Sequence, residues 1–259
     1  MRVASWNINS VRLRAELVLR VLNSCDIDVL CLQETKTEDK HFPGETFSEA
    51  GWPHLAYRGE KSYNGVAVIS RLPLSDIQHL NWAGRTDCRH ISVQVGGYRV
   101  HNFYVPAGGD IPDREENPKF GHKLAFLTEI TSYFEQEQPQ HSILVGDLNI
   151  APRAEDVWST KQLRNVVSHT DIERQMLDEA CLRGGFSDAI RTYFGDDDIL
   201  YSWWSYRARD WAASNRGRRL DHIWVSTDIK DRVSRAELFT IARGYDKPSD
   251  HVPIMIDLG

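Results

Sequence analysis

The chain has 259 residues, of which 41% are hydrophobic and 26% are charged, an ordinary balance for a globular protein with enough apolar material for a core. No apolar run approaches the ~20 residues that a membrane-spanning helix needs, and the polar residues soon after Met1 predict no secretory signal. The formal net charge of −6 argues against a nucleic-acid partner unless basic residues gather on one surface, so their distribution has to be followed along the chain.

The chain alternates short apolar strands with helices and turns, and no repeat or linker divides it. In chain order, strands are predicted at residues 2–7, 28–33, 65–70, 90–95, 99–105, 142–145, 219–225 and 252–258. The dipeptide Gly96-Gly97 is a hairpin signal between the fourth and fifth of these, which favours antiparallel pairing.

Three helices are predicted from apolar stripes. The stripe of the first consists of Leu13, Leu17, Val21 and Leu22, and that of the second consists of Phe120, Leu124, Leu127, Ile130 and Phe134. The third begins near Asp171, turns Ile172, Met176 and Ala180 inward, and stops at Gly184-Gly185. Many strands with few helices predict the α+β class. We expect a four-layer αββα sandwich of two packed, mainly antiparallel sheets covered by helices, built as one domain over residues 1–259.

The four cysteines form neither a CxxC pair nor a zinc-binding spacing. Cys31 lies in an apolar run, which predicts a buried thiol. A reducing compartment is the simplest explanation of unpaired cysteines, and we therefore expect a cytoplasmic protein.

Polar residues follow the first two predicted strands. Asn7 lies in the segment Trp6-Asn7-Ile8-Asn9, and Glu34 comes directly after the strand at 28–33. A carboxylate at the edge of a sheet is the oxygen donor that a hard cation such as Mg²⁺ prefers. Taken alone, a polar turn and a surface glutamate are the commoner interpretations.

The segment Gly146-Asp147-Leu148-Asn149 ends a buried strand, and its glycine permits a close backbone approach. If the chain stays extended, Asp147 and Asn149 point the same way, and an acid beside an amide suits holding a water and a phosphate oxygen. A turn that uses Asp and Asn as turn formers is the alternative.

Two further segments place an acid next to an imidazole, Asp221-His222 and Asp250-His251. An acid beside a histidine fixes the tautomer and charge of the ring. For His251 alone, a structural histidine would be the better interpretation.

One stretch of the chain is strongly basic. Residues 205–219 contain Arg207, Arg209, Arg216, Arg218 and Arg219 but only one acid, Asp210. Trp203, Trp204, Tyr206 and Trp211 lie in or beside it. Basic residues track phosphates and aromatic rings stack on bases, although a solvated loop with about half of the aromatic residues in the core is the alternative.

Taken in order, six motifs resemble the endonuclease/exonuclease/phosphatase superfamily, and within it the exodeoxyribonuclease III family of abasic-site endonucleases. They are Trp-Asn-Ile-Asn, Leu-Gln-Glu-Thr-Lys, Tyr-Val-Pro, Gly-Asp-Leu-Asn-Ile, Arg-Leu-Asp and Ser-Asp-His, running from Asn7 to His251. The fourth and sixth motifs are shared by the superfamily and imply phosphoester hydrolysis. Residues 33–36, 104–106, 202–204 and 215–217 are typical of its DNA-repair branch.

The resemblance implies three sets of site residues. The metal ligands would be Glu34, Asn7, Asp250, Asp147 and Asn149, holding Mg²⁺ with Mn²⁺ as a substitute. The catalytic residues would be Asp147, His251, Asp221, Tyr104 and Asn149. The residues that contact DNA would be Lys36, Arg89, Trp203, Tyr206, Arg207, Arg216 and Leu220. In this scheme Asp147 deprotonates the attacking water, His251 paired with Asp221 binds a phosphate oxygen, and Tyr104 contacts the scissile phosphate.

The resemblance implies a DNA-repair nuclease that acts by metal-assisted in-line attack of water, as a 3′-to-5′ exonuclease on duplex DNA and as an endonuclease 5′ to abasic sites. We expect a monomer acting on double-stranded DNA with abasic sites or 3′ ends, with no membrane partner. One alternative is a superfamily phosphatase acting on a small or lipid phosphoester, which the Trp- and Arg-rich segment disfavours. Another is a catalytically dead DNA-binding module, which predicts the loss of at least one catalytic residue, and none is lost.

The chain departs from the family pattern in two places. Residues 107–110 read Ala-Gly-Gly-Asp, where relatives often carry an amide and a basic or polar residue, so one phosphate contact is missing or replaced. Arg218 stands where some relatives place a tryptophan that walls the abasic-sugar pocket, while Trp203 and Leu220 remain as apolar walls.

Overall fold

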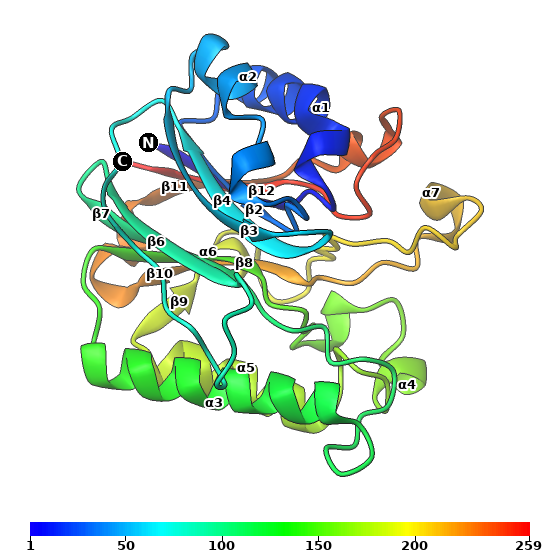
Figure 1. The fold of residues 1–259 in the computed structure, drawn as a ribbon. Helices are drawn as coiled ribbons and strands as arrows, with labels where there is room; N and C mark the ends of the chain where they lie inside the picture. The colour runs from blue at the N-terminus through cyan, green and yellow to red at the C-terminus, as the bar shows by residue number, and fades with distance from the viewer.

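The computed structural model describes residues 1–259 and has two six-stranded β-sheets packed face to face (Figure 1). In spatial order the first sheet contains β11 (Val233–Leu238), β12 (Ile254–Leu258), β1 (Arg2–Asn7), β2 (Val29–Gln33), β4 (Tyr63–Ser70) and β3 (His54–Glu60). The second contains β5 (Ser75–Gln78), β6 (His90–Val95), β7 (Tyr98–Tyr104), β8 (Ser142–Asp147), β10 (Asp221–Ser226) and β9 (Phe186–Asp188). Only β1–β2 and β7–β8 are parallel pairs, so the expected mainly antiparallel pairing is confirmed.

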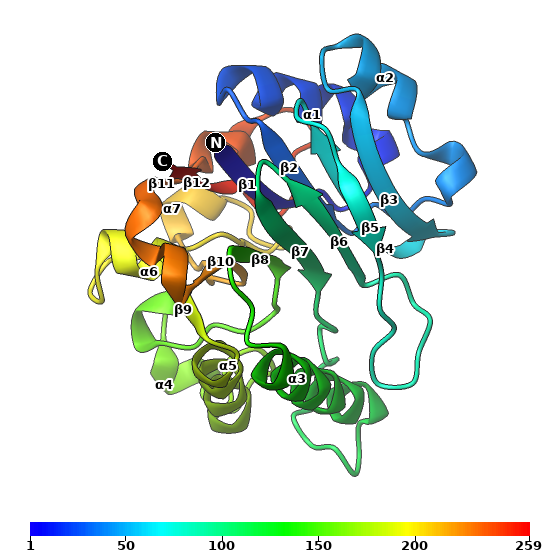
Figure 2. The same cartoon turned by 90° about the vertical axis from the view of Figure 1, so that its left-hand side faces the viewer.

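Helices cover both outer faces of the sandwich. The first sheet is covered by α1 (Val11–Ser24) and α2 (Gly44–Glu49), while α3 (Pro118–Glu137) and α5 (Asp171–Arg183) lie side by side over the second (Figure 2). The four-layer αββα arrangement is therefore confirmed. The shorter helices are α4 (Thr160–Leu163), α6 (Ala189–Phe194), α7 (Trp211–Ser214) and the 3₁₀ turns η1 (Asp39–His41), η2 (Ala154–Asp156), η3 (Thr227–Arg232) and η4 (Thr240–Gly244). None of the helices has the length and apolar character needed to cross a lipid bilayer.

All eight predicted strands are present, and the four strands that the sequence did not predict are β3, β5, β9 and β11. These four are the edge strands of the two sheets. An edge strand pairs on one side only, and all four residues of β5 are exposed. The apolar pattern of such a strand is therefore weak, which explains why pattern reasoning finds the central strands and misses the edges.

Two predicted helix faces are partly wrong. Leu13 is 60% exposed, because α1 is kinked at Arg14 and turns Val11 and Val18 inward instead. The Arg14 side chain is itself buried and donates to the carbonyl oxygens of Ile8 and Lys247. In α5 the start of the helix is fixed by a capping box rather than by an apolar contact. Glu173 is buried in that box with Thr170, while Ile172 is 38% exposed.

The core is divided into three main apolar layers. The largest lies between the sheets and includes Val3, Cys31, Val145 and Ile223. The second lies between the first sheet and α1–α2, and the third lies between the second sheet and α3–α5. Cys31 is fully buried, as predicted, and all four cysteines are free thiols.

Gly146 lies in the centre of the second sheet, where β8 pairs with both β7 and β10. Its φ is +149°, and a Cβ atom added there would lie 1.9 Å from the carbonyl oxygen of Phe103. The close backbone approach expected from the sequence is therefore present. Any side chain at this position would push β7 away from β8.

We expect Gly146→Ala to lower the free energy of unfolding by about 3 kcal/mol or more, because both the backbone conformation and the clash with Phe103 oppose the methyl group. Gly244→Ala is the matched control, since a Cβ there meets nothing within 4 Å, and should change stability by less than about 0.5 kcal/mol. Chemical denaturation measures both variants. Equal stability of the two would contradict the packing described here.

Candidate active site

The inward-facing rows of the central strands change from apolar to polar at one end of the sandwich. Along β1, β8 and β10 these rows read Val3-Ser5-Asn7, Ile143-Val145-Asp147 and Val225-Ile223-Asp221. In the sheet register Asp147 lies opposite both Asp221 on β10 and Tyr104 on β7. Because alternate residues of a strand face the same side, strand pairing alone brings these polar side chains together between the sheets.

A buried hydrogen-bond layer separates the polar end from the apolar core. Gln33 donates through Nε2 to Oγ of Ser5 (3.0 Å) and to Oδ1 of Asn102 (2.7 Å). Asn102 belongs to the second sheet and donates to the carbonyl oxygens of Leu32 and Ala67 in the first (3.0 and 2.9 Å). These bonds fix the position of one sheet relative to the other directly beneath the site.

Asp147 is buried at the end of β8 and lies at the centre of the polar cluster. Its Oδ2 accepts from Nδ2 of Asn7 (2.8 Å) and from Nδ2 of Asn149 (3.1 Å), and it lies 3.7 Å from Nε2 of His251. Of the two interpretations of this segment, an extended chain and a turn, the structure has the turn, because Asn149 has a φ of +54°. A tight turn brings the two side chains together instead, with the Asn149 amide N–H donating to Oδ1 of Asp147 (2.9 Å).

Glu34 follows β2 and has three side-chain partners. Its Oε1 accepts from Asn7 Nδ2 (2.9 Å) and from the Tyr104 hydroxyl (2.8 Å), and its Oε2 pairs with Lys36 Nζ (2.8 Å). Glu34 and Lys36 both adopt positive φ values, 51° and 50°, which cost energy for residues other than glycine. One amide, that of Asn7, thus bridges the carboxylates of Glu34 and Asp147.

His251 is oriented by Asp221, the pairing that the family resemblance implies. Nδ1 of His251 donates to Oδ2 of Asp221 (2.7 Å), so Nε2 faces Asp147. Ser202 also donates to Oδ2 of Asp221 (2.6 Å) and accepts from the amide N–H of Leu220 (3.0 Å). Sequence reasoning did not find this role of Ser202, and only its place beside the two tryptophans signals it. Oδ1 of Asp221 is buried and has no hydrogen-bond donor.

Asp250 joins the cluster through two donors. Asn9 Nδ2 donates to its Oδ1 (3.1 Å), and Trp203 Nε1 donates to its Oδ2 (3.0 Å). Asn9 in turn accepts from Lys36 Nζ (2.6 Å), so it links Asp250 to the residues around Glu34. Asn9 was not among the predicted site residues, although it lies in the first polar segment after β1.

The electrostatics of the cluster follow from burying several carboxylates together. Burial, with repulsion from Asp221 and Glu34, raises the pKa of Asp147, and attraction to His251 and the bond from Asn7 only partly offset this. Burial alone would lower the pKa of His251, but the carboxylates of Asp221 and Asp147 outweigh it and raise that pKa. Burial opposes ionisation of Glu34, yet Lys36 and the bonds from Asn7 and Tyr104 bring the pKa of Glu34 below its usual value. His251 is therefore an imidazolium that compensates the acids around it.

The expected DNA-contacting residues fall into two groups. Lys36, Arg89 and Trp203 touch the cluster directly, since they contact Glu34, Tyr104 and Asp250. Arg89 lies over the Tyr104 ring, 4.7 Å from its centroid, and donates to the Tyr104 carbonyl oxygen (3.2 Å). Leu220 is buried behind Trp203 in a small apolar cluster, so it supports that ring from within the protein.

The basic stretch is only partly a surface feature. Arg207, Arg209 and Arg216 are exposed on the segment that carries α7, which projects from the sandwich in Figure 1. Arg219, by contrast, is 1% exposed and pairs with Asp188 (2.5 Å), and Arg218 donates to Ser168 Oγ (2.7 Å). The basic stretch therefore contributes fewer free charges than the sequence indicated. Tyr206 is exposed, and its hydroxyl donates to the carbonyl oxygen of Pro248 (2.8 Å).

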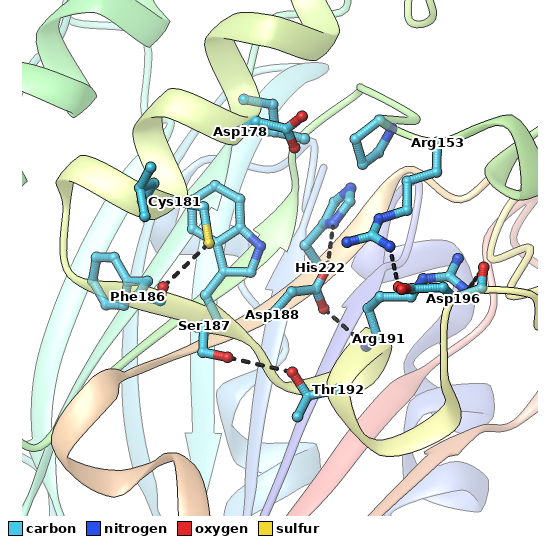
Figure 3. A pocket seen from close by; sticks show the side chains of 14 residues that line it. Arg153, Asp178, Cys181, Phe186, Ser187, Asp188, Arg191, Thr192, Asp196 and His222 are labelled. Carbon is cyan, nitrogen blue, oxygen red and sulfur yellow. Dashed lines mark hydrogen bonds and ion pairs between the residues drawn. The ribbon is translucent and has the colours of Figure 1, made fainter.

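A cavity of about 280 Å³ lies behind β10, between α5, β9 and α6 (Figure 3). His222 lines it and bonds through Nε2 to the carbonyl oxygen of Ile150 (2.8 Å), one residue beyond Asn149. Successive residues of a strand face opposite sides, so His222 points away from the face that carries Asp221. This cavity therefore lies behind the loop that carries Asp147 and Asn149, and none of the clustered acids lines it.

The chain is similar to known proteins in both sequence and fold. Residues 4–251 match the endonuclease/exonuclease/phosphatase family. An exodeoxyribonuclease of Bacillus subtilis is 31% identical over 98% of both chains, and exodeoxyribonuclease III of Haemophilus influenzae is 28% identical over 98% of both. Two solved structures, each 30% identical, cover 100% of this chain and 99% of their own. They are an AP endonuclease from Archaeoglobus fulgidus (TM-score 0.93) and a 3′ phosphatase from Neisseria bound to a product DNA hairpin (TM-score 0.92). The chain belongs to the endonuclease/exonuclease/phosphatase family, and its resemblance to the exodeoxyribonuclease III branch is confirmed.

We expect the His251 ring to stay protonated across about pH 5 to 8 in the metal-free protein. In the Asp221→Asn variant the pKa of His251 should fall into that range, because the main group that raises it is lost. Because the folded-state pKa lies above 6.5, the stability due to the imidazolium is full below that pH and is lost as the pH rises through the folded-state value. Ring NMR shifts measure the titration. Asp228→Asn, at the opposite end of β10, is the control and should leave His251 unchanged. If Asp221→Asn also left the titration of His251 unchanged, Asp221 would not be the partner that keeps the ring protonated.

Proposed function

We propose that this member of the endonuclease/exonuclease/phosphatase family is a DNA-repair nuclease. Its activities would be 3′-to-5′ exonuclease action on duplex DNA and incision 5′ to abasic sites. The observation that carries the proposal is the Asp147–His251–Asp221 arrangement beside Glu34 and Tyr104. In it a base (Asp147), an imidazolium (His251) and a hydroxyl group (Tyr104) lie close together. The relatives and neighbours named above as exodeoxyribonucleases and an AP endonuclease support the choice of DNA over other phosphoesters.

The donor set fits a hard divalent cation. Glu34, Asn7, Asp147, Asn149 and Asp250 offer carboxylate and amide oxygens and no sulfur, which suits Mg²⁺ with Mn²⁺ as a substitute. Burial raises the pKa of Asp147, and repulsion from Asp221 and Glu34 adds to this, so a cation at the site would favour the ionised carboxylate. The buried Oδ1 of Asp221, which has no hydrogen-bond donor, adds to the negative charge of the cluster. A bound cation would supply charge stabilisation to the phosphoryl oxygens.

The chain's own residues supply the remaining chemistry. Asp147 accepts a proton from the attacking water as the water oxygen bonds to phosphorus. The bond from phosphorus to the 3′ oxygen breaks in line, and the 3′ oxygen leaves with the electron pair and takes up a proton from solvent. The Nε2 proton of His251 and the Tyr104 hydroxyl are donors to the non-bridging oxygens, where charge accumulates. Asp221 and Ser202 hold the ring of His251 so that Nε2, and not Nδ1, faces the phosphate. Asn149 positions the Asp147 carboxylate through its side chain and its backbone N–H.

The proposed contacts to DNA lie on both sides of this cluster. Lys36 and Arg89 support the Glu34 and Tyr104 side chains, and Trp203 stands beside Asp250 as a wall for the sugar. Arg207 and Arg216 would track the phosphate backbone from the projecting segment, with Tyr206 at its base.

The four free thiols are in keeping with the cytoplasm, and we propose that residues 1–259 act as one domain and as a monomer.

A phosphatase acting on a small or lipid phosphoester is not favoured. The exposed arginines lie on a segment that projects from the sandwich (Figure 1), and a polymer with repeated charges explains them better than a small phosphoester does. The neighbour named as a 3′ phosphatase was itself solved with DNA, which is in keeping with a DNA substrate for either reaction.

Asp147→Asn should separate water activation from DNA binding. The change keeps the shape of the side chain but removes the base, so single-turnover cleavage of a duplex with one abasic analogue should slow by about 100- to 10,000-fold. DNA affinity should hold or improve, because repulsion between a carboxylate and the phosphate is relieved. His251→Ala should slow cleavage by about 100-fold and also weaken binding, because a donor to phosphate is lost.

Asp221→Asn should act through His251, giving a smaller loss than His251→Ala and little further loss in the double variant. Asp228→Asn controls for the loss of an acid far from the cluster and should cleave normally. Near-normal single-turnover cleavage by Asp147→Asn would show that another group is the base.

A further inference from the structure

A fully buried ion pair lies beneath the candidate active site. Lys123 on α3 and Glu173 on α5, the two helices that lie side by side in Figure 2, are both 0% exposed. Nζ of Lys123 lies 2.5 Å from Oε1 of Glu173. Because well-packed apolar residues can often replace such a pair at no cost to stability, its presence here points to a role other than stability.

Lys123 joins the two loops that follow the parallel strands β7 and β8. Its Nζ donates to the carbonyl oxygen of Asn149 (2.8 Å), in the loop after β8, and to that of Ala107 (3.3 Å), in the loop after β7. Together with Glu173, these acceptors use all three N–H groups of the ammonium. Lys123 therefore has no donor left for a phosphate, and its side chain is closed off from solvent.

Glu173 is itself held by the loop that leads to α5. Its carboxylate accepts from the backbone N–H groups of Ser168 (2.9 Å) and Thr170 (3.2 Å) and from the Thr170 hydroxyl (2.6 Å). Gly108 leaves the space for the lysine stem, because a Cβ atom there would lie 2.9 Å from Cδ of Lys123. Glu173 thus fixes the ammonium of Lys123 at one position between the loops.

Asn149 is the residue on which the pair acts. Its φ of +54° is a left-handed conformation, which a residue with a side chain keeps only where contacts hold it. Lys123 binds its carbonyl oxygen, while its N–H donates to Oδ1 of Asp147 (2.9 Å). Its Nδ2 donates to Oδ2 of Asp147 (3.1 Å) and to the carbonyl oxygen of Val105 (3.0 Å). A change in the Asn149 backbone would therefore move two donors to the Asp147 carboxylate.

We propose that Lys123, held by Glu173, is a positioning residue that fixes the left-handed turn at Asn149 and so aims the Asp147 carboxylate at the attacking water. The inference rests on the proposed function, in which Asp147 is the base. Lys123 touches neither the substrate nor the reacting atoms, so its effect passes through Asn149. A shift of a reacting group by about 1 Å can slow a reaction by about 100-fold, and such a shift need not weaken DNA binding.

The test is the double variant Lys123→Met/Glu173→Gln, which removes both charges, keeps the side chains similar in size and leaves no buried carboxylate unpaired. On a duplex with one abasic analogue, its single-turnover rate at saturating DNA should fall by about 10- to 100-fold. Its DNA affinity should stay within about twofold of normal. The slope of log affinity against log salt should not change, because no phosphate contact is lost.

Phe134→Leu is the matched control for lost stability. Phe134 is buried near the far end of α3 and packs on Phe186, away from both loops. Its truncation lowers stability, yet the single-turnover rate of the folded variant should stay within about twofold of normal. Glu173→Gln alone is a milder variant, in which Lys123 keeps its two carbonyl acceptors but loses its counter-charge. Its rate should fall by about three- to tenfold.

Two measurements test the route through Asn149. In an Asn149→Ala background, the double variant should lose no more than about threefold further in rate, because the residue through which the pair acts has been removed. In the metal-free protein without DNA, the backbone N–H of Asn149 should exchange with solvent about tenfold faster in the double variant than in Phe134→Leu. This second measurement does not depend on cleavage.

A normal single-turnover rate in the double variant would overturn the proposal. So would a normal rate in Glu173→Gln, which decides alone if the double variant does not fold. A salt slope lower by about 1 would show that Lys123 contacts a phosphate, and a full further loss in the Asn149→Ala background would show that the pair acts elsewhere. Unchanged exchange at Asn149 would also overturn the proposal. Failure of the unaltered protein to cut the duplex would contradict the proposed function instead, and the exchange measurement would still test the positioning of Asn149.

Discussion

The structure depends on holding several buried acids close together without an excess of unpaired charge. Asp147, Asp221 and Glu34 all lie at the polar end of the space between the sheets, where isolated carboxylates would be strongly destabilising. The cost is offset by the imidazolium of His251, by Lys36, and by donors placed at short range. Burial keeps the pKa of Asp147 raised in spite of these groups, so its carboxylate is suited to accept a proton and to be stabilised by a cation.

The sandwich provides this arrangement through its topology. Each sheet has one parallel pair near its centre, β1–β2 in the first and β7–β8 in the second. Because the strands of a parallel pair end at the same edge of the sheet, the side chains at their carboxyl ends lie next to each other. The antiparallel β10 adds Asp221 from its amino end, opposite Asp147. The bonds of Gln33 and Asn102 then fix one sheet against the other. Asn7, Tyr104, Asp147 and Asp221 stand on strands, which favours a precise geometry. Hydrogen bonds hold Glu34, Asn149 and His251, which lie outside the strands, to these residues.

The central strands and the clustering of the motifs could be predicted from the sequence, because buried strands have continuous apolar patterns and the motifs follow strand ends. Edge strands could not, since their exposed residues lack such a pattern. Ser202 and Asn9 were missed because their roles depend on contacts with residues distant in the sequence. Arg219 looked like a surface charge in a basic run, but it is buried and pairs with Asp156 and Asp188. The net charge of −6 similarly hides the local excess of basic groups around Tyr104.

The central claim is that the acidic cluster hydrolyses DNA phosphodiester bonds with the help of a divalent cation. The most direct test incubates the protein with Mg²⁺ and a duplex that carries one abasic analogue, beside an intact duplex, and repeats the reaction in EDTA. We predict incision 5′ to the analogue and shortening of the intact duplex from its 3′ ends. Both activities should be abolished by chelation and restored by Mg²⁺ or Mn²⁺. Full activity in the chelator, or no cleavage of either duplex with Mg²⁺ present, would contradict the account.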